Sequence, residues 1–411
     1  MGMIINIDEA LKQHSRYNVL REPLNAMMTE MQEAWEKKNP IDLLFKRGTL
    51  SSFQETYTSN IGFARAFTET SDYAVGPIFN TAEGFSATYR SRTFQGGFII
   101  TQQTLEDGKA GQVKDDATAF LKRWHADIVE YAMTAVEGGF EGTKLVDGQS
   151  KPMGVFEGGD GKTTTIKLTS ADTTDGKIDT PTKNPLFSIN HKTVDRGDGT
   201  PVVTQSNMFR AVDGDGNPIV IGGSDPGQIA KLADFINLVI TEMENVRDDN
   251  GKRAGVTGSK TIVAGNDARL RAAIENALSL DMVQGVMNPA YKRATLETTP
   301  YLNDIAPTAN GVGFFIIDKE YNNSNHGLEF TERIPLTMDV IETKRPKGIT
   351  HDARQRFDVN NATWRGIAYC YIGTPSSTEG HWNYSGKFTE KEVVSTLVKP
   401  VNVVNASEIG A

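Results

Sequence analysis

The feature that most constrains the fold is a pair of predicted strands, between about residues 65 and 101, that runs directly into an amphipathic helix. Apolar and aromatic side chains occur along both strands, at Tyr73, Ile78, Phe79, Tyr89 and Phe94. Residues 80–84 (Asn-Thr-Ala-Glu-Gly) form a turn-rich stretch between the strands. An isolated hairpin is marginally stable in water because it cannot cover its own apolar residues. This hairpin therefore predicts a partner surface, which is either another copy of the chain or the body of the same subunit.

Composition describes a soluble protein and excludes several classes. The chain has 411 residues, a formal net charge of -9 and 38% hydrophobic residues, enough for more than one core. No apolar run approaches the roughly 20 residues of a membrane helix, so no membrane partner is predicted. The basic residues are scattered among carboxylates, which argues against a nucleic-acid-binding surface. The single cysteine, Cys370, excludes an intrachain disulfide and lies in an apolar run typical of a buried, unreactive thiol.

Apolar residues at helical spacing predict a first helix over about residues 20–38, ending before Asn39-Pro40. Its stripe comprises Leu20, Leu24, Met27, Met28, Met31 and Trp35. Methionines suit an adaptable contact face. Such a stripe faces either the core of its own subunit or a neighbouring molecule. We predict an arm that lies along a neighbour, because little of the chain precedes this helix.

The remainder of the chain mixes helices and strands. Helices are predicted over about residues 115–136 and from Pro226 onward, with a Gly/Asp/Thr-rich, β-rich insertion between them. The apolar segment 261–264 predicts an interior strand followed by a helix over 268–280, capped by Asn266 or Asp267. Closing strands are predicted over 312–317, 336–340, 354–359 and 362–372, the last two pairing through a turn at Asn360-Asn361.

Motifs that would carry chemistry are incomplete. The Gly/Lys/Thr stretch 158–163 lacks the first glycine of a phosphate-binding loop, and residues 213–218 lack most of the ligands of a calcium loop. The six histidines form no pair at metal-ligand spacing. We therefore predict no catalytic, metal or cofactor-binding residues, no cofactor and no enzyme activity.

The order of elements resembles the major capsid protein of tailed bacteriophages, which has the HK97-type fold. The resemblance is carried by Phe98–Asp107 leading into the helix from Asp115, by the strand-helix unit 261–280, and by the closing segments Arg354–Asp358 and Thr363–Gly366. It covers most of the chain by the order of its elements and includes no single diagnostic motif.

The resemblance implies an α+β fold with an N-terminal arm, an extended β-hairpin called the E-loop, a peripheral domain with a long spine helix, an axial domain and a β-rich insertion. The implied ranges are 1–64 for the arm, 65–106 for the E-loop, 107–140 for the spine helix, 141–224 for the insertion, 225–260 for a second peripheral helix, 261–333 for the axial domain, 334–372 for the closing peripheral strands and 373–411 for the C-terminal segment.

The resemblance also implies a function and partners. Copies of the chain would assemble as hexamers and pentamers into an icosahedral virion shell, in the host cytoplasm, enclosing double-stranded DNA without sequence-specific binding. The other implied partners are a portal, a decoration protein and a scaffolding protein, the last with a leader segment that has already been removed as its alternative. An encapsulin-like compartment shell and, from another class, a β-rich carbohydrate-binding or adhesion protein remain the alternatives.

The implied intersubunit contacts lie on the arm and the E-loop. They are Leu24, Met27, Met28, Met31, Trp35, Tyr73, Ile78, Phe79, Tyr89, Arg90, Arg92 and Phe94, with Arg90 and Arg92 facing carboxylates of a neighbour.

Some relatives cross-link covalently through an E-loop lysine, but this chain has no lysine between Lys46 and Lys109. The shell should therefore be held by burial and ion pairs alone. Assembled protein is expected to run as a single monomer band on a denaturing gel. A ladder of covalent oligomers would contradict this prediction.

Overall fold

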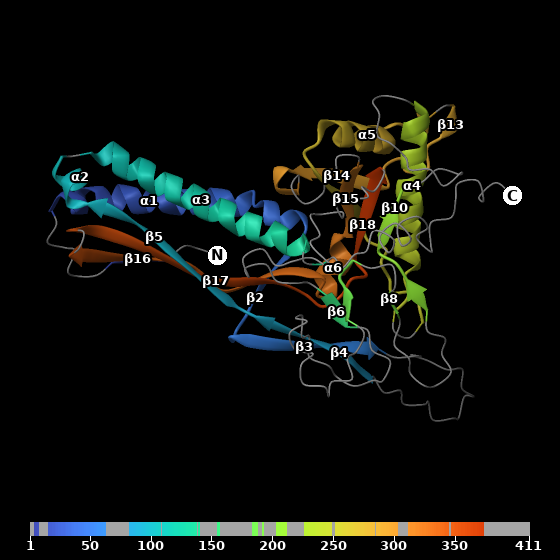
Figure 1. Cartoon of the computed structure of the whole chain (residues 1–411), viewed down its shortest axis with the longest axis horizontal. Helices are drawn as coiled ribbons and strands as arrows, with labels where there is room; N and C mark the ends of the chain where they lie inside the picture. The colour runs from blue at the N-terminus through green and yellow to red at the C-terminus, as the bar shows by residue number, and fades with distance from the viewer. Residues whose placement is uncertain are drawn as a thin grey trace, which may run out of the picture.

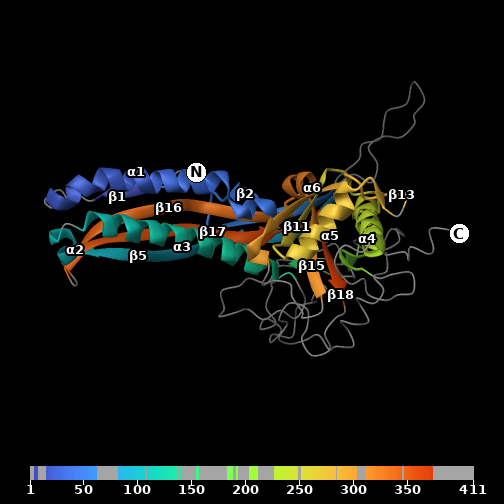
Figure 2. The ribbon, with the colours of Figure 1, turned by 90° about the horizontal axis from the view of Figure 1, so that it is seen from above.

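The structure, a computed structural model, describes residues 4–7, 15–62, 82–107, 109–137, 139, 154–156, 183–187, 191–192, 203–211, 226–248, 251–283, 285–302, 311–344 and 347–373. The molecule is elongated, with a long sheet and two helices at one end and a second sheet with further helices at the other (Figures 1 and 2). It is an α+β fold, as the sequence predicts.

The long sheet forms the elongated end of the molecule. Its strand order is β1 (Ile4–Ile7), β16 (Leu328–Lys344), β17 (Lys347–Asn361) and β5 (Arg92–Thr101), and β2 (Lys46–Thr49) also pairs with β16. Strands β16 and β17 form a long antiparallel hairpin, whereas β1 and β2 pair with β16 in parallel. The two short parallel strands thus add the N-terminal part of the chain to a hairpin from its C-terminal part.

Helices α1 (Ser15–Lys37) and α3 (Ala110–Glu137) cover one face of the long sheet (Figure 2). The short helix α2 (Gln102–Glu106) links β5 to α3. Leu24 and Met28 of α1 and Leu121 of α3 share a buried cluster with Met338 and Ala353 of the sheet. The sheet is thus an amphipathic layer whose apolar face is covered by two helices.

The predicted ribbon exists, but its first strand lies earlier in the chain than expected. Strand β3 (Gln54–Gly62) pairs with β4 (Ala82–Arg90), starting at the Gln54 and Arg90 pair. Residues 82–84, predicted as part of the tip, belong to β4, and the segment 63–81 lies outside the described residues. After Ser91 the returning strand continues as β5 and leaves the ribbon for the long sheet. The returning strand that the sequence predicts as continuous is therefore divided into β4 and β5, because β5 pairs with the distant strand β17.

The second sheet forms the other end of the molecule. Its strand order is β10 (Met208–Arg210), β18 (Ile367–Gly373), β15 (Gly311–Asp318), β11 (Lys260–Gly265) and β14 (Ala294–Thr299). Helices α4 (Pro226–Asn245) and α5 (Ala268–Ser279) pack on it, sharing a core that includes Cys370. Asp267 caps α5 as predicted, and burial raises the pKa of the Cys370 thiol.

The remaining elements are short. They are η2 (Pro40–Leu43), β6 (Gly154–Phe156), β7 (Lys183–Pro185), β8 (His191–Lys192), β9 (Thr204–Gln205), β12 (Met282–Val283), β13 (Val286–Met287), η5 (Pro300–Leu302) and α6 (Lys319–Ser324).

One predicted strand pairing is wrong. The hairpin predicted to turn at Asn360-Asn361 is absent, because β17 pairs with β16 and β5 whereas β18 pairs with β15 and β10. Helix α4 packs with α5 and β18 in the core of the second sheet. The prediction paired two segments that are neighbours in sequence, whereas the chain crosses there from the long sheet to the second sheet.

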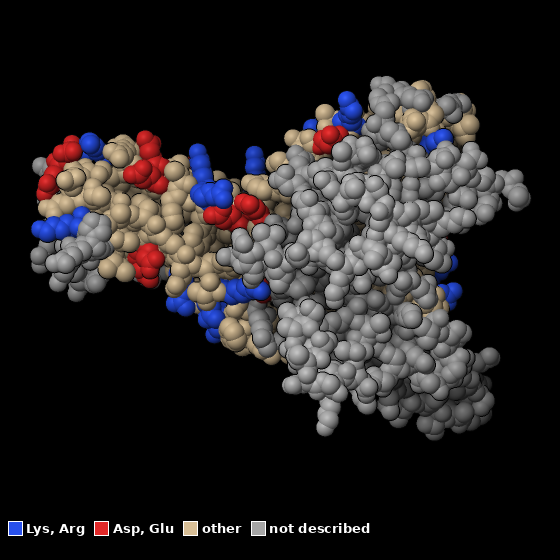
Figure 3. All heavy atoms as spheres, in the orientation of Figure 1, with Lys and Arg blue, Asp and Glu red and all other residues tan. Residues whose placement is uncertain are grey.

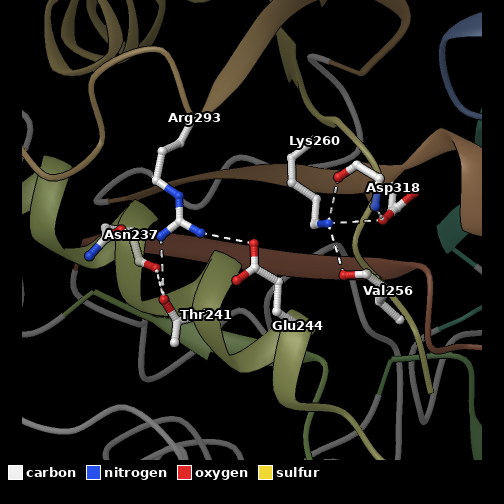
Figure 4. Close-up of polar contacts among 8 residues, drawn as sticks. Asn237, Thr241, Glu244, Val256, Lys260, Arg293 and Asp318 are labelled. Atoms are coloured by element: carbon white, nitrogen blue, oxygen red, sulfur yellow. Dashed lines mark hydrogen bonds and ion pairs between the residues drawn. The ribbon is translucent and has the colours of Figure 1, made fainter. Parts of the chain in front are cut away.

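A buried ion pair holds the start of β11 in the second sheet. Lys260 Nζ lies 2.8 Å from Asp318 Oδ2, and both side chains are at most 2% exposed. The ammonium also donates to the carbonyls of Val256 and Gly258 (Figure 4). Asp318 accepts from the backbone amide of Tyr321 at the start of α6. Every strong polar group of the pair is thus satisfied, which is what makes its burial tolerable.

Replacing Lys260 with Met should destabilise the protein by about 3 to 5 kcal/mol, because Asp318 would be left charged and buried without its partner. Urea unfolding followed by circular dichroism measures the change. The matched control is Arg271→Ala, which breaks the exposed Arg271–Glu275 pair and should cost less than about 1 kcal/mol. Equal effects of the two variants would contradict the prediction.

Two buried histidines lie on the helix-covered side of the long sheet. His125 of α3 bonds Gln32 of α1 at 2.8 Å and stacks on Trp35, with 4.3 Å between ring centroids. His351 of β17 stacks on Phe98 of β5, at 4.8 Å. Burial lowers the pKa of each histidine to about 4, although Glu36 opposes the shift for His125. Both rings are therefore neutral in the folded protein near pH 7.

Acidification should loosen this end of the molecule. Since the folded pKa values lie below the usual value of about 6.5, the stability they provide is complete above pH 6.5 and is lost as the pH falls toward 4. The free energy of unfolding, measured with urea at pH 7.5, 5.5 and 4.5, should fall with pH by on the order of 3 kcal/mol per histidine. The variant His125→Gln should show a weaker dependence of stability on pH. An unchanged dependence in this variant would contradict the role of His125.

Candidate intersubunit surfaces

The β3–β4 ribbon is the first candidate contact surface. It is a separate two-stranded sheet that extends from the long sheet, and no third described strand pairs with it (Figure 1). Its root is anchored by Leu50, Tyr57 and Tyr89, with the two tyrosine rings 4.7 Å apart. Beyond this root, no other described strand pairs with the outer edge of either strand. Exposed strand edges readily pair with or pack on another chain.

A local hydrogen-bond network orients the start of the ribbon. Glu55 accepts from Ser51 and from the backbone amide of Ser52, and Tyr57 donates to it at 3.0 Å. The hydrogen bond from the Ser51 hydroxyl is the main reason that the pKa of Glu55 falls to about 2. Burial, followed by the Glu55 hydrogen bond, raises the pKa of Tyr57 to about 12. The ribbon therefore leaves the body at a turn whose carboxylate stays ionised.

The predicted contact residues of the first helix lie against the body of the same chain. Leu24 and Met28 are 1% and 0% exposed in the core beneath α1. Met27 and Met31 pack partly buried against that core, and Trp35 stacks on His125. The partner of this stripe is the long sheet, built from residues about 300 positions further along the chain. In this conformation the stripe therefore faces the chain's own core instead of a neighbour.

Residues near the ribbon's root are also engaged within the chain. Tyr89 is buried in the root, and Phe94 stacks on Phe357 with 4.3 Å between centroids. Arg92 Nε lies 3.8 Å from the buried carboxylate of Asp358, so that its charge is paired inside the subunit. Arg90 is the last residue of β4, and its side chain lies outside the described part of the structure. Tyr73, Ile78 and Phe79 lie wholly outside the described residues. Contacts of these last four residues with a neighbour stay a prediction.

An exposed apolar hairpin was missed by the sequence reasoning. Strands β12 and β13 pair across Gly285, which has a φ of 78°, and they display Met282, Val286 and Met287 at 56%, 69% and 83% exposure. The signal was present, since apolar residues flank a glycine on both sides in Met282–Met287. The exposure of these side chains depends on the position of the hairpin, at the outer end of the part of the molecule that holds the second sheet (Figure 1).

Charged side chains of both signs are interspersed over the described part of the face in Figure 3. Among the described residues no cluster of histidine, cysteine or carboxylate side chains has the arrangement of a metal site. No described helix is both long and apolar enough to cross a membrane.

No protein-family model and no curated protein matches the chain. Among solved structures, one titled Mycobacterium phage Patience is 13% identical with a TM-score of 0.45, covering 93% of this chain and 95% of its own. The capsid of Myoviridae phage XM1 is 11% identical with a TM-score of 0.40, covering 81% and 90%. The chain is similar to phage capsid proteins.

The chain is also similar to a virus-like particle from Pyrococcus furiosus, at 9% identity and a TM-score of 0.40, covering 87% of this chain and 99% of the other.

Proposed function

We propose that the chain is an HK97-type major capsid protein, whose copies assemble into a closed icosahedral shell around double-stranded DNA. The observation that carries the proposal is the β3–β4 ribbon, a two-stranded sheet that leaves the body beyond a buried root and with which no third described strand pairs. Hairpins of this kind are marginal alone and become stable on a partner surface. A second copy of the chain supplies such a surface repeatedly, as a lattice requires.

The elongated shape and the exposed hairpin at its outer end support the same role. The ribbon root lies near the middle of the molecule, and the β12–β13 hairpin lies at the outer end of the part that holds the second sheet (Figure 1). Contacts at separate places on one chain let each copy touch several neighbours, so that weak contacts combine by multivalency. We place Met282, Val286 and Met287 in such a contact because exposed apolar clusters mark interaction sites.

The finer features of the proposal follow from the resemblance and from charge. The shell is expected to form in the host cytoplasm with a scaffolding protein, a portal and a decoration protein as partners. A net charge of -9 suits a wall that encloses DNA without binding it tightly. The arm, E-loop, peripheral and axial ranges given above remain part of the proposal, and so does the absence of catalysis.

Shortening the ribbon should abolish shell formation without unfolding the chain. The variant deletes residues 59–85 and joins the cross-strand neighbours Thr58 and Ser86 through Asn-Gly, a favoured two-residue turn. Tyr57, Tyr89 and the buried root are kept. Electron microscopy and sedimentation velocity should find closed shells, or rings of five and six subunits, for the unaltered protein and only small species for the variant.

The matched control for this experiment is Arg271→Ala, which breaks an exposed ion pair on α5, outside the ribbon and the β12–β13 hairpin, and should assemble as the unaltered protein does. Thermal unfolding of all proteins checks that the shortened variant is folded. Normal shells from the shortened variant would contradict the role of the ribbon. A small, uniform oligomer from the unaltered protein, with and without a scaffolding partner, would contradict the proposed function itself.

A further inference from the structure

Three arginines gather on the face of the long sheet that α1 and α3 leave uncovered. On β17, Ala353 and Phe357 are buried toward the helices, and Gln355 between them bonds Trp124 of α3 at 2.9 Å. Because side chains alternate along a strand, Arg354 and Arg356 project from the opposite face. Arg333, on the neighbouring strand β16, lies close enough to disfavour the charge of Arg356. We call Arg333, Arg354 and Arg356 the arginine cluster.

The positive charges of this cluster are not neutralised within the described residues. None of the three guanidinium groups makes an ion pair or a hydrogen bond there, and Arg356 Nε is buried without a hydrogen-bond partner. Desolvation, followed by repulsion from Arg333 and Arg354, lowers the pKa of Arg356. The guanidinium of Arg356 makes one described cation–π contact, with the ring of Phe53 at 5.7 Å from the ring centroid. Phe53 is itself 54% exposed. Such a cluster favours an anionic partner that satisfies several guanidinium groups together.

A matching anionic surface lies on the exposed side of α1. Glu22, Glu30 and Glu33 are exposed, form no ion pair within the described residues, and lie on one side of the helix at their spacing. The opposite side of the helix buries Leu24 and Met28. Glu22 and Glu33 are about 16 Å apart along the axis, at 1.5 Å per residue. We call these three glutamates the acidic stripe.

We propose that the arginine cluster of one copy binds the acidic stripe of α1 in a second copy. The two surfaces lie on opposite sides of the long sheet and its helix layer, so they do not meet within one chain. A contact between unlike surfaces is heterologous and repeats from copy to copy, closing a ring when its rotation allows. This inference rests on the proposed shell function and names one of its contacts.

A second copy fits the cluster better than nucleic acid does. Along β17, Arg354 and Arg356 are about 7 Å apart, and Glu30 and Glu33 are about 5 Å apart along their helix axis, so that paired contacts are geometrically matched. Asp352, the next residue on the same face of β17, would repel a chain of phosphates, and the protein as a whole carries a charge of -9.

Charge reversal tests the pairing. The variants are Arg354→Glu with Arg356→Glu, Glu30→Arg with Glu33→Arg, and all four substitutions together. Each one-sided pair should raise the protein concentration needed for half-assembly by about tenfold or more, since like charges would then face each other. The fourfold variant should return to within about threefold of the unaltered protein, because complementarity is restored. Light scattering and sedimentation velocity measure assembly, at low and high salt.

The matched control reverses two exposed arginines at the end of the molecule that holds the second sheet, Arg253→Glu with Arg269→Glu. This variant should assemble normally. Thermal unfolding verifies that each variant is folded, and the glutamate variants, on an exposed helix side, keep the test valid if the arginine variants unfold.

Normal assembly of both one-sided variants, or no recovery in the fourfold variant, would overturn the pairing. Binding of a fluorescent duplex oligonucleotide that is lost only with the arginines would assign the cluster to phosphate instead. If the unaltered protein forms no shell, the proposed function fails; if it does and the swaps have no effect, only this inference fails.

Discussion

The pairing of β17 with both β16 and β5 is the constraint on which the rest of the structure depends. Its register brings Phe357 opposite Arg92 and Gly348 opposite Thr101, joining segments about 250 residues apart. A side chain at Gly97 would place its Cβ 2.5 Å from the carbonyl oxygen of His351, so a glycine is required for this close approach. Through β5, the pairing fixes where the ribbon leaves the body and where α3 begins.

Polar contacts then hold α3 over β17 at defined positions. Trp124 donates to Gln355, whose amide in turn donates to Glu332 at 2.7 Å, and Tyr131 donates to Asp358 at 2.8 Å. Burial raises the pKa of Tyr131, and Asp358 contributes in the same direction. These bonds satisfy polar groups inside an otherwise apolar layer and fix the position of the helix along the strand.

A shared core couples the two ends of the molecule. Ile128 and Val129 of α3 pack with Phe357 of β17 and with Phe315 and Tyr369 of the second sheet. On the second sheet's other side, α4 is tied to the start of β14, where Arg293 reaches Asn237, Thr241 and Glu244 (Figure 4). These cores and contacts join the two ends of the molecule, and the surfaces proposed above to meet another copy lie outside them.

Local signals in the sequence determined the elements that depend on local physics. The helices at 15–37, 110–137 and 226–245, the Asp267 cap, the interior strand β11 and the buried Cys370 all follow from spacing, capping and apolar runs. Only the tertiary structure decided which layer each element joins. The apolar stripe of α1 has the same sequence pattern whether it faces a neighbour or the core of its own chain. The sequence likewise predicts β4 and β5 as one strand, and only the pairing of β5 with β17 separates them. The reason is physical: burial and strand pairing join segments hundreds of residues apart, and periodicity records that a face is buried but not what covers it.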